Sequence, residues 1–259
     1  MKKIFRWTIG NSSNLGFEVL RKSVKFAKKN FEALGFDLYI CSNSNEVKVS
    51  EICQEFEIKH IVQNNENNFF KKFGGSFWKL CPPRINIDSY EIICDNDVIL
   101  KKIPEEIELF LKSNVPIICE EKIFCFGKYS KFIKNPYNSG IYGLPPGFNF
   151  EQKIIQKWKE KGSIEKLRSY KDEQGLIILC LLEFNPIKIP LDKVCYLFKF
   201  GSPVKADYEK VLEDNFESQI LQNLIFERPK TKNKSIFHFI DSNKIEDHFY
   251  WNSYKTKFL

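Results

Sequence analysis

The stretch Asp88-Ser-Tyr-Glu-Ile-Ile-Cys-Asp-Asn-Asp-Val-Ile-Leu100 is the most informative part of this chain. An apolar run suited to a buried strand ends in two carboxylates, Asp95 and Asp97, which flank Asn96, and a second apolar run follows at once. Ionised carboxylates are costly at the end of a buried strand unless a positive charge compensates them. Magnesium and manganese prefer oxygen ligands, and open α/β sheets bind ligands at the carboxyl ends of their strands. The stretch therefore predicts a metal site, although Asp-Asn-Asp is also a common turn sequence.

The residues before this stretch alternate between strand and helix patterns. Strands are expected at residues 4–9, 36–41 and 60–62, with helices at 15–34 and 46–56. Gly35 is expected to end the first helix. This alternation predicts an α/β fold with a parallel sheet and right-handed crossovers.

The rest of the chain contains shorter elements. Further strands and helices are expected at residues 104–112, 115–118, 122–126, 150–161, 172–184, 187–200, 235–240 and 245–254. Asp172 is expected to be the N-cap of its helix. Residues 135–150 contain three glycines and three prolines, which predicts a shaped loop instead of a helix or a long strand.

The composition limits the class of protein. The chain has 259 residues, of which 43% are hydrophobic and 28% charged, and a net charge of +7. This length suits one large α/β domain. The basic residues are spread along the chain, which favours nucleotide diphosphates, acidic glycans or an anionic membrane surface as partners over nucleic acid.

Localisation is predicted from what the sequence contains. The eight cysteines form no CxxC pair, the first residues contain no apolar leader, and no apolar run is long enough to cross a bilayer. These features predict a cytoplasmic protein with reduced thiols. Peripheral contact with a membrane surface stays open.

Four segments resemble, in the same order, the nucleotide-sugar glycosyltransferases of the GT-A fold, which carry an Asp-X-Asp motif. The segments are residues 78–84, 95–97, 138–143 and 172–174. The resemblance implies one α/β, GT-A (Rossmann-like) catalytic domain over residues 1–259, with a mixed, mostly parallel sheet flanked by helices and a C-terminal extension of helix and strand. Residues 1–100 would bind the nucleotide, and residues 101–259 the sugar and the acceptor. It further implies transfer from a nucleotide diphosphate sugar, UDP favoured, to a glycan, lipid-linked or protein acceptor.

The resemblance also implies roles for particular residues. Asp95, Asp97 and His238 would bind manganese or magnesium, although a plain strand histidine is the alternative for His238. Asp172 or Glu173 would be the catalytic group, either as a general base or as a stabiliser of the positively charged sugar. The residues expected to bind the nucleotide sugar are Thr8, Gly10, Asn11, Trp78, Lys79, Arg84, Asp95, Asn96, Asn138, Ser139 and Gly140.

Other classes of protein remain as alternatives. A sugar-phosphate nucleotidyltransferase shares the sheet but usually has a glycine-rich phosphate loop, whereas residues 10–14 contain one glycine. A glycan- or nucleotide-sugar-binding protein with little turnover would not need the costly acids. A metal-dependent nuclease would need a larger acidic cluster and a basic groove. His60 and His248 are assigned no role, because His60 begins a strand and His248 is expected in a surface helix.

Overall fold

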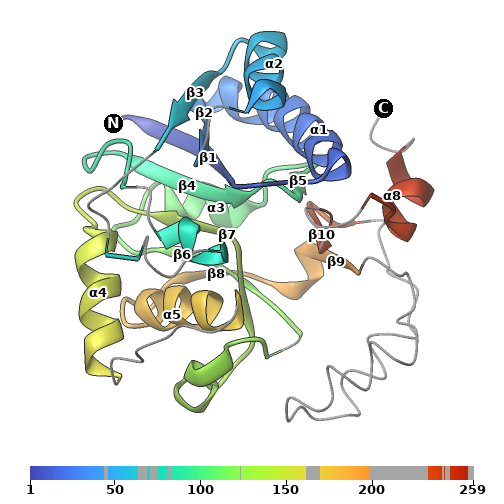
Figure 1. Cartoon of the computed structure of the whole chain (residues 1–259). Coiled ribbons are helices and arrows are strands. Elements are labelled where there is room, and N and C mark those ends of the chain that lie inside the picture. The colour runs from blue at the N-terminus through green and yellow to red at the C-terminus, as the bar shows by residue number, and fades with distance from the viewer. Residues whose placement is uncertain are drawn as a thin grey trace.

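The computed structural model of the chain describes residues 1–43, 46–63, 69–70, 75–80, 83–122, 124–161, 170–198, 233–240, 242 and 246–255. These residues form two sheets with helices around them (Figure 1). The strand order is β3-β2-β1-β4-β7-β6-β8 in the seven-stranded sheet and β5-β10-β9 in the three-stranded sheet.

The large sheet is mixed and mostly parallel, as the sequence predicts. Pairs β1–β2, β2–β3, β1–β4 and β6–β8 are parallel, and β7 runs antiparallel between β4 and β6. Its strands are β1 (Lys3–Ile9), β2 (Phe36–Ser42), β3 (Lys59–Val62), β4 (Tyr90–Asp95), β6 (Ile117–Glu120), β7 (Tyr137–Leu144) and β8 (Ile187–Ile189).

Helices cover the two faces of this sheet. Alternate residues of β4 enter different cores: Ile92 and Cys94 pack in the first, and Ile93 packs in the second. Buried apolar residues of α2 and α3 and most of those of α1 belong to the first core, and those of α4 and α5 belong to the second; Leu15 and Val19 of α1 pack in a third core. The helices are α1 (Asn14–Phe31), α2 (Val47–Phe56), α3 (Glu105–Phe110), α4 (Phe150–Glu160) and α5 (Tyr170–Leu182).

The small sheet brings the C-terminal part of the chain to the acidic motif. It contains β5 (Val98–Leu100), β9 (Val194–Phe198) and β10 (Ile236–Ile240). Strand β10 is antiparallel to β5, so that His238 lies opposite Val98. Helix α8 (Phe249–Tyr254) follows, and Trp251 packs into the same core as this sheet.

One stretch expected as a loop is a strand. Residues 137–144 form β7, and every one of them is buried. Two of its glycines are required by packing, because a Cβ at Gly140 would lie 2.7 Å from His238 Cε1 and a Cβ at Gly143 would lie 2.7 Å from Ile117 Cγ2. The loop prediction was wrong because it counted glycines and ignored this close approach of neighbours.

Three other local predictions were also wrong. The described residues of the segment 122–126 form no strand. Helix α5 begins two residues before Asp172, and the Asp172 carboxylate instead accepts a hydrogen bond from the backbone N–H of Lys128 at 2.9 Å. His248 is buried and is the N-cap of α8, where its side chain accepts from the N–H of Trp251.

Candidate active site

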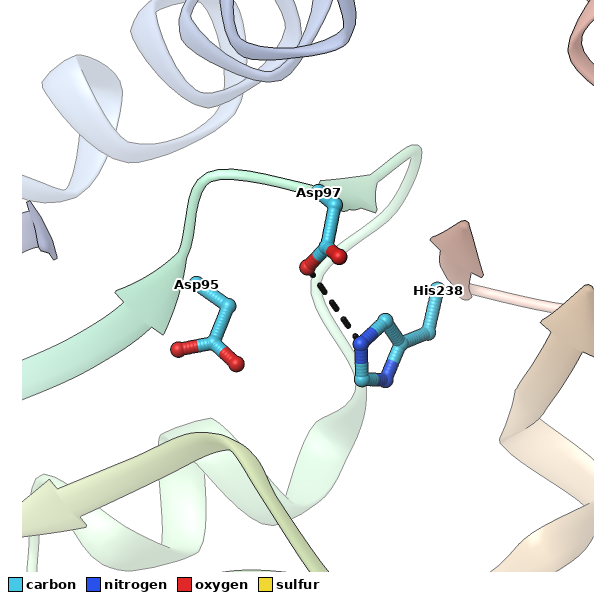
Figure 2. Close-up of side chains that lie close together, drawn as sticks. All are labelled: Asp95, Asp97 and His238. Atoms are coloured by element: carbon cyan, nitrogen blue, oxygen red, sulfur yellow. Dashed lines mark ion pairs between the residues drawn. The ribbon is translucent and has the colours of Figure 1, made fainter. Parts of the chain in front are cut away.

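The acidic motif forms the link between β4 and β5, at the carboxyl edge of the large sheet (Figure 2). Its three side chains diverge. The amide of Asn96 donates to the backbone oxygen of Gly16 in α1 at 3.5 Å, whereas Asp95 and Asp97 lie beside His238. Asn96 therefore has a structural contact with α1, whereas Asp95 and Asp97 are the two candidate metal ligands.

His238 completes the acidic pair from the other sheet. One ligand atom each of Asp95, Asp97 and His238 lies within 4.8 Å of the others. His238 Nε2 is 3.3 Å from Asp97 Oδ1 (Figure 2), and the N–H of Phe239 donates to the backbone oxygen of Asp97 at 2.8 Å. Burial opposes the imidazolium charge, but the neighbouring carboxylates of Asp97 and Asp95 outweigh it and raise the pKa of His238.

The donor atoms of this group fit a divalent metal. Two carboxylates and an imidazole are ligands that manganese accepts, and the carboxylates suit magnesium. Asp97 Oδ1 is buried, and among the described residues it has no hydrogen bond beyond its 3.3 Å ion pair with His238 Nε2. A buried carboxylate oxygen in that state is unfavourable, and a bound cation would compensate it.

Lys79 bridges the motif to α5. It lies on the 3-10 helix Gly75–Leu80. Its Nζ is 2.6 Å from Asp95 Oδ2 and 4.0 Å from Glu173 Oε2. Burial opposes the ammonium charge, but the carboxylates of Asp95 and Glu173 raise the pKa of Lys79. Lys79 is therefore a cation that lies between two acids.

The two candidate catalytic acids differ in their surroundings. Asp172 packs on the glycine of a turn, since a Cβ at Gly127 (φ +51°) would lie 2.1 Å from Asp172 Oδ1. Glu173 is 2% exposed, and its Oε1 has no hydrogen-bond partner among the described residues. Burial raises the pKa of Glu173 to about 7, with Lys79 opposing and Asp95 adding to the shift. Glu173 is thus the acid of the pair that faces Asp95 and Lys79.

Strand β7 lines the site beside His238. The Asn138 side chain accepts from the N–H of Gly140 at 2.6 Å and donates to Glu121 Oε2 at 3.1 Å. The hydroxyl of Ser139 donates to Gln174 Oε1 at 3.3 Å. The structure thus brings the predicted residues of β7 to the same edge as the acidic motif.

Two polar residues of this region were missed by the sequence analysis. Glu121 follows the apolar run of β6 just as Asp95 follows that of β4, so the same signal was present. Gln174 lies in the segment 172–174 that resembles the glycosyltransferases, but the sequence predicted no role for it; its amide donates to the backbone oxygen of Cys125 at 3.1 Å.

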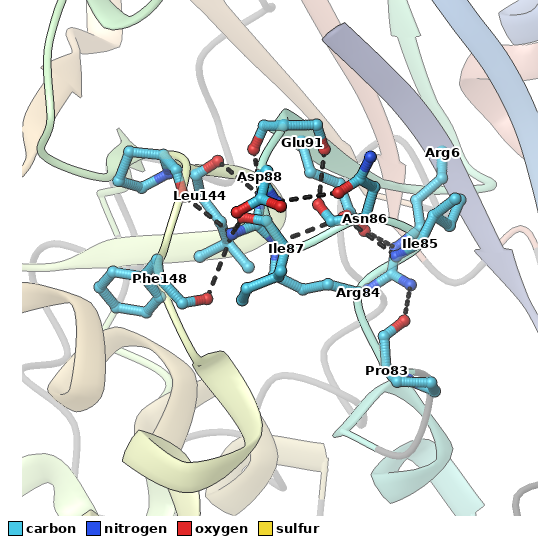
Figure 3. A network of polar contacts seen from close by, with 12 residues as sticks. Arg6, Pro83, Arg84, Ile85, Asn86, Ile87, Asp88, Glu91, Leu144 and Phe148 are labelled. Carbon is cyan, nitrogen blue, oxygen red and sulfur yellow. Dashed lines mark hydrogen bonds and ion pairs between the residues drawn. The ribbon is translucent and has the colours of Figure 1, made fainter. Parts of the chain in front are cut away.

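Some of the remaining candidates for donor binding lie near the acidic motif, and others do not. Thr8 lies opposite Asp95 in the β1–β4 pair, and Gly10 and Asn11 follow the same end of β1. The side chain of Trp78 lies outside the described residues. Arg84 lies elsewhere: its Nε is 3.3 Å from Glu91 Oε2, at the beginning of β4 (Figure 3).

Comparison with known proteins identifies the fold. No protein family model matches the chain, and no curated protein matches it in sequence. Among solved structures, the galactosyltransferase LgtC aligns with 98% of this chain and 94% of its own, with a TM-score of 0.56 at 12% identity. The chain has the GT-A fold. At this identity the likeness establishes the arrangement of the GT-A sheet and helices, and not a donor or an acceptor.

Two larger glycosyltransferases share this GT-A fold. GlyE of Streptococcus pneumoniae matches over all of this chain and 60% of its own, with a TM-score of 0.55 and 14% identity. The bifunctional WbbM matches 95% of this chain and 46% of its own, with a TM-score of 0.56 and 13% identity. No helix in the described part of the chain is long and apolar enough to span a membrane.

The raised pKa of Glu173 predicts a pH-dependent stability of the metal-free protein. Between the ordinary carboxyl pKa and about 7, the folded state binds more protons at Glu173 than the unfolded state does, so this residue lowers stability as pH rises. The stability of Glu173→Gln relative to the native sequence should therefore increase by about 2–3 kcal/mol from about pH 5 to pH 8. Urea unfolding in EDTA measures this difference, and a difference that does not change with pH would contradict the assignment.

Because Gly140 packs closely against His238, a larger residue at position 140 should weaken metal binding. The Cβ of Gly140→Ala would lie 2.7 Å from His238 Cε1 and displace the ring. Displacing a ligand in this way should weaken Mn²⁺ binding by about tenfold or more, as measured by calorimetric titration. Gly143→Ala is the matched control because it crowds Ile117 and Phe110 instead. It should destabilise the core and leave Mn²⁺ affinity unchanged; equal losses in the two variants would point to general damage to β7.

Proposed function

We propose that this protein is a metal-dependent glycosyltransferase that transfers a sugar from a nucleotide diphosphate sugar, with UDP favoured, to a hydroxyl group of a glycan, lipid-linked or protein acceptor. The observation that carries the proposal is the Asp95–Asp97–His238 group at the edge of a GT-A sheet. Further support comes from LgtC, a galactosyltransferase whose structure contains donor and acceptor sugar analogues.

The chain's own residues would divide the work of donor binding. Asp95, Asp97 and His238 would bind Mn²⁺ or Mg²⁺ next to the diphosphate. When bound, such an ion neutralises the negative charge that develops on the leaving diphosphate. Thr8, Gly10 and Asn11 would contact the nucleotide, and Asn138, Ser139 and Gly140 would contact the transferred sugar.

Glu173 is the residue proposed to act on the reacting groups. It is buried, adjacent to Lys79, and its pKa of about 7 suits proton transfer near neutral pH. In an inverting reaction its carboxylate would accept the proton of the acceptor hydroxyl while the bond from the sugar to the diphosphate breaks. In a retaining reaction it would stabilise the positive charge on the sugar. Asp172 would position this helix through its bond to Lys128.

Nucleotide release from a panel of donors tests the proposal. The protein is incubated with UDP-, GDP- and CDP-sugars, with and without Mn²⁺, with simple glycosides as acceptors, and free nucleoside diphosphate is measured. We expect release from one nucleotide class that requires Mn²⁺. Thermal stabilisation by a nucleotide sugar without any release would support the binding-protein alternative, and the absence of both would contradict the proposal.

A further inference from the structure

The ammonium group of Lys79 is paired with one carboxylate oxygen of Asp95, a candidate metal ligand. Its Nζ is 2.6 Å from Asp95 Oδ2, so this oxygen of the acidic motif already has a cationic partner. The contact is largely screened from water, since the side chains of Lys79 and Asp95 are 25% and 13% exposed. Asp95 therefore binds a charge supplied by the protein itself.

Several buried carboxylates lie near this cation, and the protonated ring of His238, with Nε2 3.3 Å from Asp97 Oδ1, provides a second positive charge. Asp97 is 4% exposed and Glu173 is 2% exposed, and Glu173 Oε2 lies 4.0 Å from Lys79 Nζ. Buried carboxylates at such spacing repel one another and favour any compensating cation. Lys79 provides part of that compensation in the absence of a metal. A divalent ion that approaches Asp95 meets both competition from Lys79 for this carboxylate and repulsion from the ammonium.

The backbone that carries Lys79 is anchored by its neighbours, whereas the long side chain of a lysine has several rotatable bonds. Phe77 and Leu80, on the same 3-10 helix, are 4% and 3% exposed and belong to the core beneath α4 and α5. A lysine has a flexible four-carbon stem and a charge that requires no fixed geometry. Lys79 can therefore leave Asp95 without unfolding of the 3-10 helix, and Glu173 remains within reach as an alternative partner.

We propose that Lys79 is a built-in counter-ion that competes with the divalent metal for Asp95, so that metal binding releases its ammonium group from the acidic motif. The inference rests on the metal assignment of the proposed function and concerns the metal-free state as well as the loaded one. Metal binding at Asp95 and the ion pair between Lys79 and Asp95 would exclude each other. The released cation is then available to Glu173 and to an anionic donor.

A Mn²⁺ titration of Lys79→Met without any nucleotide tests the competition. The metal-free variant should melt at a lower temperature than the native sequence, because the buried carboxylates lose their cation. It should bind Mn²⁺ at least about tenfold more tightly, since a like charge next to a ligand is removed. Lys59→Met is the matched control: Lys59 is 60% exposed and lies on β3, away from the motif. Its Mn²⁺ affinity should equal that of the native sequence.

A second measurement uses the native sequence, so it remains available if the variant does not fold. Acetylation of Lys79 by a soluble acylating reagent is followed by mass spectrometry of peptides. Saturating Mn²⁺ should speed the acetylation of Lys79 and leave that of Lys59 unchanged.

The outcomes separate this inference from the proposed function. Mn²⁺ that binds the native sequence and Lys79→Met with equal affinity, or the variant more weakly, would overturn the inference alone. Equal acetylation of Lys79 with and without bound Mn²⁺ would do the same. Mn²⁺ that binds neither protein would overturn the metal assignment itself, and the inference with it.

Discussion

Replacing Asp97 with asparagine should lower metal-dependent sugar transfer by about a thousandfold or more. The substitution keeps the shape of a residue that is 4% exposed and removes one of the two anionic ligands of the candidate metal group. Stabilisation of a leaving diphosphate by a metal contributes several kcal/mol, and each tenfold in rate corresponds to about 1.4 kcal/mol. Loss of the ion from the site therefore predicts an effect of this size.

The measurement is release of nucleoside diphosphate from the best donor at saturating Mn²⁺. Asp192→Asn is the matched control, because Asp192 is an exposed acid on the 3-10 helix Leu191–Lys193, and it should leave the rate unchanged. Thermal melting with and without Mn²⁺ should show that Asp97→Asn folds but gains no stability from the ion. A variant that retains more than about a tenth of the native rate would exclude Asp97 as an essential ligand.

The acidic motif was predictable because its signal is local. An apolar run that ends in two acids requires a compensating cation, wherever the rest of the chain lies. The βαβ alternation placed that run in a parallel sheet by the same local reasoning. His238 entered the site only through the resemblance, since its contact with Asp97 depends on the pairing of β10 with β5, and no spacing in the sequence encodes that pairing.

The roles of Asp172 and Glu173 were not separable from the sequence. Adjacent residues on a helix point about 100° apart, so one of the two faces the motif and the other does not. Which one does so depends on how α5 packs. The Asp172 carboxylate accepts a hydrogen bond from the backbone N–H of Lys128, and this contact joins segments that are distant in the chain. The sequence therefore identified the pair but not the member that faces Lys79.

Arg84 was predicted at the donor because it lies just upstream of the acidic motif. The signal for its actual place was also in the opening stretch: Glu91 is a charged residue inside a buried strand, and such a residue requires cationic partners. Arg6, on the neighbouring β1, is one of them, with its Nε 2.9 Å from Glu91 Oε1. A buried acid in the middle of an apolar strand thus predicts a nearby cationic partner. Glu91 has two such partners, Arg6 and Arg84.

Of the substitutions predicted here, Glu91→Gln in the buried ion-pair network should lower the stability of the fold the most. Glu91 is 0% exposed and Arg6 is 1% exposed, and Arg84 also donates through Nη1 to the backbone oxygen of Pro145 at 2.8 Å. Glu91→Gln would leave two buried guanidinium groups without their counter-charge. Breaking a buried pair in this way costs about 3–5 kcal/mol, a large part of the total stability of about 5–15 kcal/mol expected for a folded domain.

Urea unfolding of Glu91→Gln in EDTA measures this loss, with Glu108→Gln, an exposed acid on α3, as the matched control. The comparison also separates a structural role of the network from a role in binding. Glu91 and Asp95 are four residues apart on one strand, a distance of about 13 Å at 3.3 Å per residue. The folded fraction of Glu91→Gln should therefore bind Mn²⁺ with native affinity. A variant as stable as the control would contradict the structural role of this network. A stable variant that binds Mn²⁺ poorly would show that the network serves the site and not the fold.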